Sequence, residues 1–288
     1  MTAPIGIVGL GLLGHAIATR LVAGAYDVIG YDVVPERTAA LERLGGRAAA
    51  SVAAVAAATE AVCVVLPSLT SVEEVIVGGD GLVARGGAGQ TILQMSTISP
   101  TLTRTLAHEV GERGRAFLDC PISGTSGMVA EGHGVVFVGG DRTAFDRWHA
   151  LLDTILPRPV YVGEAGQAMA LKLVANLLVG LHSVAAAEAL TLARKAGLDL
   201  DLTLDVLGNG AAGSRMLDVR GPLIAKGEFP AQMKLDLFMK DLHLIQAAAA
   251  EVGATIPLTD VAERLYASAQ AAGHGPEDLA VVVRALER

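Results

Sequence analysis

The sequence predicts an α/β protein in which a doubly wound, mostly parallel sheet domain is followed by an all-helical domain. Short apolar runs alternate with helical segments over residues 1–163, as expected for consecutive βαβ units. After residue 163 the strand-like runs stop and a long apolar helical pattern begins. Hydrophobic residues make up 52% of the 288 residues but aromatic residues only 3%, which favours parallel strands and helices packed through small and branched side chains.

The strands expected in the first domain are short apolar runs at residues 5–9, 28–32, 61–66, 91–95, 116–119, 135–138 and 160–162. The run 61–66 is apolar throughout, as expected of a strand that is covered on both faces. Helices are expected over residues 12–22, from about residue 35, over 100–111 and over 143–152. Pro35 suits the first turn of its helix, because the missing N–H has no partner there in any case.

The second domain, residues 164–288, is expected to be built on one long helix over 166–196, which Gly197 would end. Further helices are expected over 200–207, 233–252, 257–271 and 276–286, and no strand is expected there. The long helix is apolar around most of its circumference. One small domain would not cover all of this apolar surface. We therefore expect dimerisation through this region.

Charge and composition exclude several classes of partner. The formal net charge is −8, from 30 acidic and 22 basic residues, and no basic cluster would neutralise a phosphate backbone, so no nucleic-acid partner is expected. Cys63 and Cys120 stand far apart in apolar runs, which is typical of buried small hydrophobic residues rather than of a disulfide. None of the seven histidines shows metal-ligand spacing, so no metal is expected.

One stretch, residues 171–193, is long and apolar enough to resemble a membrane span. It contains side chains that would be costly in lipid, namely Lys172, Asn176, His182, Ser183 and Glu188. A buried helix explains the stretch better, and no membrane is expected. The first residues enter a strand pattern without a charged segment or a cleavage site, so we expect a cytoplasmic protein.

The turn after the first strand carries a G-x-G-x-x-G pattern, formed by Gly9, Leu10, Gly11, Leu12, Leu13 and Gly14. Glycine is frequent in this chain, so the pattern is informative only because a strand precedes it and a helix follows. Gly9 would permit the tight turn, Gly11 the approach of the backbone to a pyrophosphate, and Gly14 the close packing of the helix. Free N–H groups at the helix start would face the phosphates. The pattern predicts a Rossmann-type dinucleotide site.

The nucleotide bound at this site is indicated by the end of the second strand. Asp32 lies 18 residues after Gly14 and would accept hydrogen bonds from the ribose hydroxyls of the adenosine. Its charge would also repel a 2′-phosphate, so NAD is favoured over NADP. Arg37 is the one nearby residue that argues for NADP.

Two further groups of polar residues could form a site. Lys172 lies in an apolar helix and Asn176 follows one turn later on the same face, although a lysine whose stem reaches a solvated edge is an equally good interpretation. Ser123, Gly124 and Thr125 form a turn whose N–H groups and hydroxyls suit a carboxylate, but an ordinary turn between a strand and a helix fits the same residues.

With these residues in order, the chain resembles the 3-hydroxyisobutyrate dehydrogenase family, also called the β-hydroxyacid dehydrogenases. Four motifs carry the resemblance over nearly the full length: the glycine turn at 9–14, with Leu13 where the family commonly has Met; residues 119–125, similar to D-x-P-V-S-G-G, with Thr125 in place of the second Gly; residues 166–176, matching G-x-x-x-x-x-K-x-x-x-N; and K-D-L at 240–242. The resemblance implies an NAD(P)-dependent enzyme that exchanges a hydride with a small β-hydroxyacid or its semialdehyde, and a homodimer or homotetramer.

The resemblance also implies roles for individual residues. Lys172 would be the general acid/base, since partial desolvation favours the neutral amine that can take the hydroxyl proton. Ser123, Gly124, Thr125 and Asn176 would hold the substrate, and Leu66, Pro67, Thr97 and Lys240 would lie near the nicotinamide. Asp241 is either a structural partner of Lys240 or a surface charge, and Arg215 and Arg220 are spare candidates for an anionic substrate, although a solvated surface position is the better interpretation.

Two other functions remain open at this point. An imine reductase shares the architecture and the first motif but usually lacks the catalytic lysine. A non-catalytic NAD-binding module that serves in oligomerisation is the second. Lys172 argues against the imine reductase, and Lys172, Asn176, Ser123 and Gly124 argue against the non-catalytic module.

Overall fold

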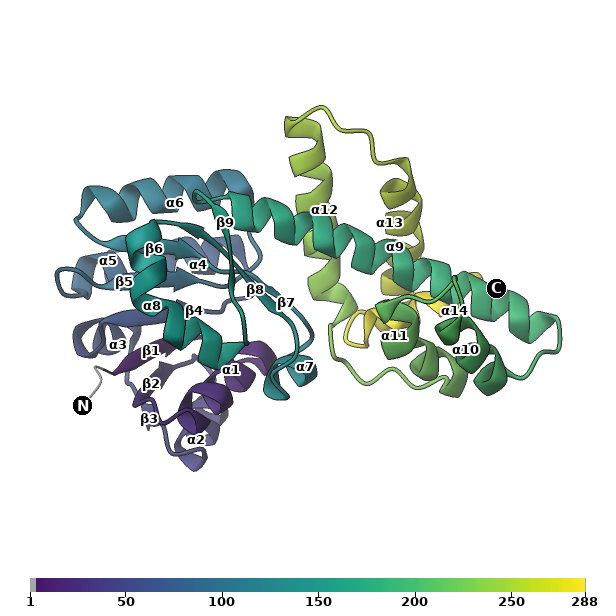
Figure 1. Ribbon diagram of the computed structural model, residues 1–288, viewed down its shortest axis with the longest axis horizontal. Coiled ribbons are helices and arrows are strands. Elements are labelled where there is room, and N and C mark those ends of the chain that lie inside the picture. The colour runs from purple at the N-terminus through teal and green to yellow at the C-terminus, as the bar shows by residue number, and fades with distance from the viewer. Residues whose placement is uncertain (1–3, 288) are drawn as a thin grey trace. The chain divides into compact units, whose positions relative to one another are not determined.

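The computed structural model describes residues 4–287 and divides the chain into two compact units, residues 1–172 and 173–288 (Figure 1). Unit 1 is a sheet with helices on both faces, and unit 2 is helical, so the predicted fold class is confirmed. The predicted boundary after residue 163 coincides with the end of the last strand, whereas the division into units falls inside the long helix. Each unit is described by itself.

The sheet of unit 1 has the strand order β3-β2-β1-β4-β5-β6-β8-β7, with β9 paired to β8. Its strands are β1 (Ile5–Val8), β2 (Val28–Tyr31), β3 (Arg47–Ala48), β4 (Ala61–Val64), β5 (Thr91–Gln94), β6 (Ala116–Asp119), β7 (Ile122–Ser123), β8 (Val135–Gly140) and β9 (Val160–Gly163). All pairs from β3 to β6 are parallel, and β8 runs antiparallel to β6 and β7. Strand order reverses between β1 and β4, where doubly wound sheets bind their ligands.

The helices of unit 1 are α1 (Leu12–Ala23), α2 (Pro35–Arg43), α3 (Val52–Ala58), α4 (Leu69–Val77), α5 (Leu82–Arg85), α6 (Pro100–Glu112), α7 (Ser126–Ala130) and α8 (Arg142–Ile155). Several start at a side-chain cap, as where Ser99 accepts from the N–H of Leu102. One apolar cluster packs α1 and α8 on the sheet, and another packs α3 to α6 on the opposite face. The predicted strands and helices all occur, whereas α3, α4, α5, α7, β3 and β7 were not predicted, because they are short or carry little periodicity.

Unit 2 consists of most of α9 (Gln167–Lys195) together with α10 (Leu200–Asn209), α11 (Arg215–Lys226), α12 (Leu235–Glu251), α13 (Pro257–Ala269) and α14 (Val283–Leu286). Gly197 has a φ of 75° just after α9, as its predicted role as a helix stop requires. Gly180 of α9 makes room for Phe238, whose ring lies 2.9 Å from where a Cβ would stand. Tyr266 closes this core and donates to the carbonyl of Gly180 at 3.0 Å.

In unit 2 one predicted helix is wrong and one helix was not predicted. The helix predicted over residues 276–286 is a 3-10 turn, Leu279–Val282, followed by the short α14. Asp278 causes the difference, because its carboxylate accepts from the N–H of Ala280 and so caps the start of the 3-10 turn. The helix α11 was not predicted, since Gly221 and Pro222 interrupt its pattern.

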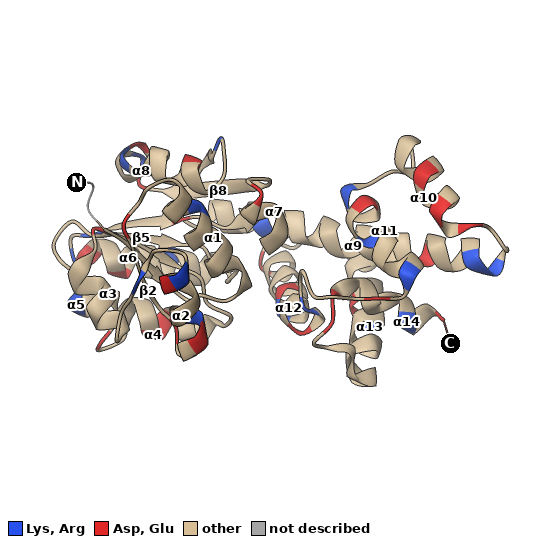
Figure 2. Ribbon diagram, turned by 90° about the horizontal axis from the view of Figure 1, so that it is seen from below, with Lys and Arg blue, Asp and Glu red and all other residues tan. Residues whose placement is uncertain are grey.

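Acidic and basic residues are interspersed along the surface helices of the described chain (Figure 2). Many form ion pairs, such as Arg142 with Asp146 at 3.0 Å and Arg47 with Asp27 at 2.6 Å. Exposed pairs of this kind contribute little to stability. Among the described residues, α9 is the one helix long and apolar enough to span a membrane, and 44% of its most apolar stretch is buried inside the protein.

Candidate active site

The predicted cofactor residues of unit 1 lie at the carboxyl ends of its parallel strands. The glycine turn follows β1, Asp32 follows β2, Leu66 and Pro67 follow β4, and Thr97 follows β5. Because these strands are parallel and adjacent, their carboxyl ends share one edge of the sheet. Residues that are far apart in the chain are thereby brought to one place.

The three glycines of the turn differ in whether the protein itself requires glycine. Gly9 has a φ of 95°, and a Cβ there would lie 2.1 Å from the carbonyl oxygen of Val65. A Cβ on Gly14 would lie 1.9 Å from the carbonyl oxygen of Gly9, so α1 packs directly on the turn. A Cβ on Gly11 would meet nothing within 4 Å, so the protein itself does not require glycine there. The open space at Gly11, above the start of α1, fits a ligand phosphate that approaches the backbone.

Asp32 is held by two main-chain donors, one in the glycine turn and one just after β2. It accepts from the N–H of Leu10 at 2.8 Å and from the N–H of Val34 at 2.9 Å, and its side chain is 5% exposed. The guanidinium of Arg37, which is half exposed, lies 3.2 Å from the same carboxylate. Arg37, the residue that favours NADP, is therefore the ion-pair partner of Asp32, the residue that favours NAD.

A buried polar pair, which sequence analysis missed, supports the loops after β4 and β5. The Ser96 hydroxyl accepts from the N–H of Leu66 at 2.8 Å and donates to the carbonyl of Val64 at 3.2 Å. Gln94, fully buried in β5, donates to the carbonyl of Ser96 at 2.9 Å. These bonds fix the segments that carry Leu66, Pro67 and Thr97. An uncharged polar side chain in an otherwise apolar strand was the available signal.

The predicted substrate turn follows β7. Ser123 pairs with Val135 of β8, and Gly124 connects it to α7. Thr125 is the N-cap of that helix, because its hydroxyl accepts from the N–H of Met128 at 3.3 Å. The Thr125 hydroxyl therefore has a structural partner, which the sequence did not indicate.

Lys172 lies in the second turn of α9 and is only 9% exposed. The first turn of that helix is held by Asp119 at the end of β6, whose carboxylate accepts from the N–H of Gly166 at 3.0 Å and from that of Met169 at 2.9 Å. Burial raises the pKa of Asp119 to about 7, although both N–H bonds act in the opposite direction.

In unit 2, Asn176 and Lys240 both contact the buried carboxylate of Asp241. Asn176, 3% exposed, donates from Nδ2 to Oδ2 of Asp241 at 2.7 Å. The other oxygen of Asp241 lies 3.1 Å from Nζ of Lys240. Asp241 is thus the structural partner of Lys240, one of the two interpretations left open by the sequence, and it also holds Asn176.

Family models cover almost the whole chain. Residues 4–176 match the NAD-binding domain of 6-phosphogluconate dehydrogenase, and residues 166–286 match the NAD-binding domain of NADP-dependent 3-hydroxyisobutyrate dehydrogenase. The chain belongs to the 3-hydroxyisobutyrate dehydrogenase family. The resemblance stated from its motifs is confirmed.

Relatives of this dehydrogenase family align over nearly their full lengths. The L-threonate dehydrogenase of Cupriavidus necator is 30% identical over 99% of this chain and 96% of its own length. The 2-hydroxy-3-oxopropionate reductase of Escherichia coli is 31% identical over 98% and 97%. The crystal structure of 3-hydroxyisobutyrate dehydrogenase from Salmonella typhimurium superposes with a TM-score of 0.91 at 30% identity, covering 98% of this chain and 99% of that one. The prediction of a hydride-transfer oxidoreductase that is an NAD(P)-dependent hydroxyacid dehydrogenase is confirmed.

The two arginines considered as substrate anchors differ in their surroundings. Arg215 is exposed and lies 4.0 Å from Asp218. Arg220 is neither a surface residue nor exposed to a substrate: it is 2% exposed and pairs at 3.1 Å with Asp278, itself 1% exposed. Its position in the middle of α11, a helix not predicted, concealed this burial.

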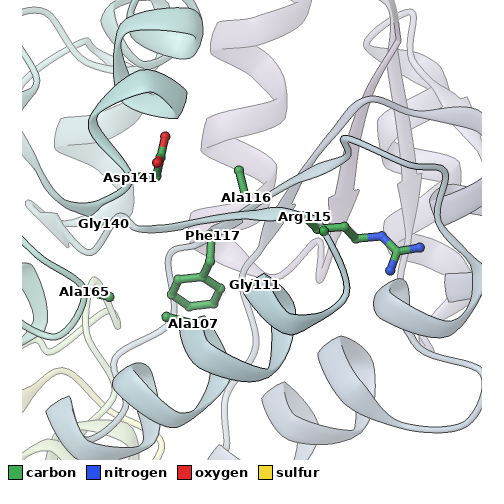
Figure 3. A pocket seen from close by; sticks show the side chains of 9 residues that line it. Ala107, Gly111, Arg115, Ala116, Phe117, Gly140, Asp141 and Ala165 are labelled. Atoms are coloured by element: carbon green, nitrogen blue, oxygen red, sulfur yellow. The ribbon is translucent and has the colours of Figure 1, made fainter.

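A depression of about 420 Å³ lies at the amino end of β6, lined by Ala107, Gly111, Arg115, Phe117 and Asp141 among others (Figure 3). Its charged residues are engaged: the Arg115 guanidinium donates to the carbonyl of Gly87, and Asp141 caps α8. This is the opposite end of the strands from the glycine turn. The depression is therefore separate from the candidate cofactor residues at the carboxyl edge. No group of three potential metal ligands occurs among the described residues.

Proposed function

We propose that this dehydrogenase oxidises the hydroxyl carbon of a small β-hydroxyacid, or reduces the corresponding semialdehyde, with NAD preferred and with Lys172 as general acid/base. One observation carries the proposal: a lysine 9% exposed, in an apolar helix whose first turn is anchored to the carboxyl edge of the sheet. A flexible surface lysine would have neither this burial nor this fixed position.

The open backbone at Gly11 and the carboxylate of Asp32 would hold the dinucleotide, which when bound supplies the hydride acceptor. Lys172 Nζ would accept the hydroxyl proton as the carbon loses its hydride. In the reductive direction the same ammonium group would donate that proton to the forming alkoxide. Positioned proton transfer of this kind contributes about 10²–10⁴-fold to a rate.

The substrate carboxylate would bind at the turn after β7. The Thr125 hydroxyl accepts a hydrogen bond from Met128 and keeps its own O–H to donate. The donors we assign to the carboxylate are therefore the Ser123 and Thr125 hydroxyls and the main-chain N–H groups of Gly124 and Thr125. Asn176 would hold the substrate hydroxyl or carboxylate, since its side-chain amide keeps a carbonyl oxygen and a second N–H besides the one that donates to Asp241. Thr97, Leu66, Pro67 and Lys240 would lie near the nicotinamide.

The preference for NAD rests on Asp32. Its carboxylate is fixed by the N–H groups of Leu10 and Val34, so it would keep its place when a nucleotide binds. We further propose a cytoplasmic homodimer or homotetramer that associates through the helical unit. Large apolar side chains there are exposed, among them Leu192 at 71% and Leu202 at 63%.

The test is a panel of β-hydroxyacids and semialdehydes, and one cyclic imine, assayed with NAD and NADP by reduced-nicotinamide absorbance. We expect turnover of at least one hydroxyacid and about 100-fold or greater loss of kcat in Lys172→Ala with unchanged NAD affinity. Lys195→Ala, at the exposed end of the same helix, is the matched control and should remain active. Turnover of the imine alone, or NAD binding without turnover of any substrate, would contradict the proposal.

A further inference from the structure

The long helix α9 begins without a cap of its own. Gly166, just before its first residue, has no side chain, and the first turn, residues 167–170, contains no acidic residue. The N–H groups of a first helical turn lack partners within the helix, so they need acceptors from elsewhere. Two main-chain N–H groups at this helix start find one acceptor, because Oδ2 of Asp119 accepts from both Gly166 and Met169.

We infer that Asp119 is a positioning residue, which sets the place of Lys172 by holding the first turn of α9. The inference rests on the proposed function of Lys172. Lys172 follows Met169 by three residues, less than one helical turn, so a displacement of that turn would be transmitted directly to the lysine. A rigid α-helix leaves little freedom to absorb it.

The surroundings of Asp119 favour a dedicated role over an incidental contact. The residue is fully buried, and its Oδ1 has no hydrogen-bond partner among the described residues. Burying a carboxyl group in this way costs stability unless something is gained. What is gained here is an acceptor, negative when ionised, at the positive end of the dipole of a 29-residue helix.

Asp119 also connects two parts of the proposed site. It ends β6, and the chain continues through Pro121 to Ser123 and the proposed carboxylate-binding turn. Asp119 therefore lies just before the segment that would hold the substrate carboxylate, and it holds the first turn of the helix that carries the proton-transfer lysine. A shift of about 1 Å between two such groups can cost about 100-fold in rate.

The test compares Asp119→Ala, Asp119→Asn and a control, Asp141→Ala, which removes a helix cap of α8 in the same unit. Asp119→Ala should lower kcat by about 10- to 100-fold while KM for NAD stays within about twofold, because the glycine turn is untouched. Asp119→Asn keeps one oxygen acceptor but loses the charge, and should recover most of kcat, to within about threefold of wild type. Asp141→Ala should leave kcat unchanged.

A second measurement does not depend on activity. Amide hydrogen exchange over residues 164–172 should be faster in Asp119→Ala than in wild type, and nearly restored in Asp119→Asn. If Asp119→Ala does not fold, a small fall in kcat with faster exchange in Asp119→Asn supports the inference. Unchanged kcat and exchange in every folded Asp119 variant would overturn it. Absence of turnover in wild type would instead contradict the proposed function and leave the exchange result to decide the role of Asp119 in holding the turn.

Discussion

The two units satisfy their buried polar side chains in different ways. In the sheet unit, Asp32, Gln94 and Asp119 each bond to main-chain groups at or near the carboxyl ends of strands. In the helical unit the buried carboxylates have side-chain partners, Asn176 for Asp241 and Arg220 for Asp278, although Asp278 also accepts from three main-chain N–H groups outside the α-helices.

This difference follows from the backbone. At the carboxyl edge of a parallel sheet the strands have ended, so loops and helix starts offer N–H and C=O groups that still need partners. Within a helix the backbone N–H groups are already bonded, so the buried carboxylates of the helical unit take donors from side chains, as well as from N–H groups in loops and at helix starts. The buried carboxylate of Asp119 accordingly relies on backbone donors, whereas Asp241 and Asp278 of the helical unit each have a side-chain donor.

The largest effect on stability should come from breaking a pair in the helical unit. Arg220→Leu leaves the carboxylate of Asp278 buried without its counter-charge, and the loss of one partner of a buried pair costs about 3–5 kcal/mol. Three main-chain N–H groups, of Gln232, Met233 and Ala280, still bond to Asp278, so we expect about 3 kcal/mol in denaturant unfolding. Arg215→Leu, at an exposed position on the same helix, should change little. Equal stability of the two variants would remove the contrast between the units.

A smaller effect on stability should appear with pH at Asp119. Its pKa is about 7 in the folded protein and 3.8 in the reference state, so between these values the folded state binds a proton that the unfolded chain does not. Stability from this group therefore falls as the pH rises from about 4 to 7. The neighbouring thiols of Cys63 and Cys120 have raised pKa values because they are buried, and stay neutral over this range.

We expect Asp119→Asn to remove this component. The difference in melting temperature between wild type and variant should change by several degrees between pH 5 and pH 8, in the direction of a relatively more stable variant at pH 8; about 1 kcal/mol corresponds to roughly 2–4 °C for a chain of this size. Parallel curves over the whole range would show that Asp119 does not titrate there.

The smallest effect concerns cofactor choice at the sheet edge. Asp32→Ala should shift the ratio of kcat/KM for NAD and NADP toward NADP by about tenfold, since about 1.4 kcal/mol of repulsion and hydrogen bonding is lost. Arg37→Ala removes the ion pair and should raise KM for NADP more than for NAD. A wild-type preference for NADP would contradict the role given to Asp32, and would instead assign the Arg37 guanidinium to a 2′-phosphate.

The sequence by itself determined the fold class and the glycine turn. Short apolar runs and helical patterns are local properties of the chain, and the three glycines lie within six residues between a strand and a helix, so the turn could be predicted from the local pattern alone. The long helix and its end at Gly197 followed from the same kind of signal. Asp32 was predictable because its spacing from the turn is set by a single βαβ unit.

Only the tertiary structure decided which polar residues support these elements. Asp119 meets Gly166 and Met169 across 47 and 50 residues, Arg220 meets Asp278 across 58, and Asn176 meets Asp241 across 65. No local pattern encodes such pairings, because each depends on which distant segments the apolar core brings together. For the same reason Arg220 was interpreted as a surface residue: its burial is a property of the packed helices and not of its neighbours in the chain.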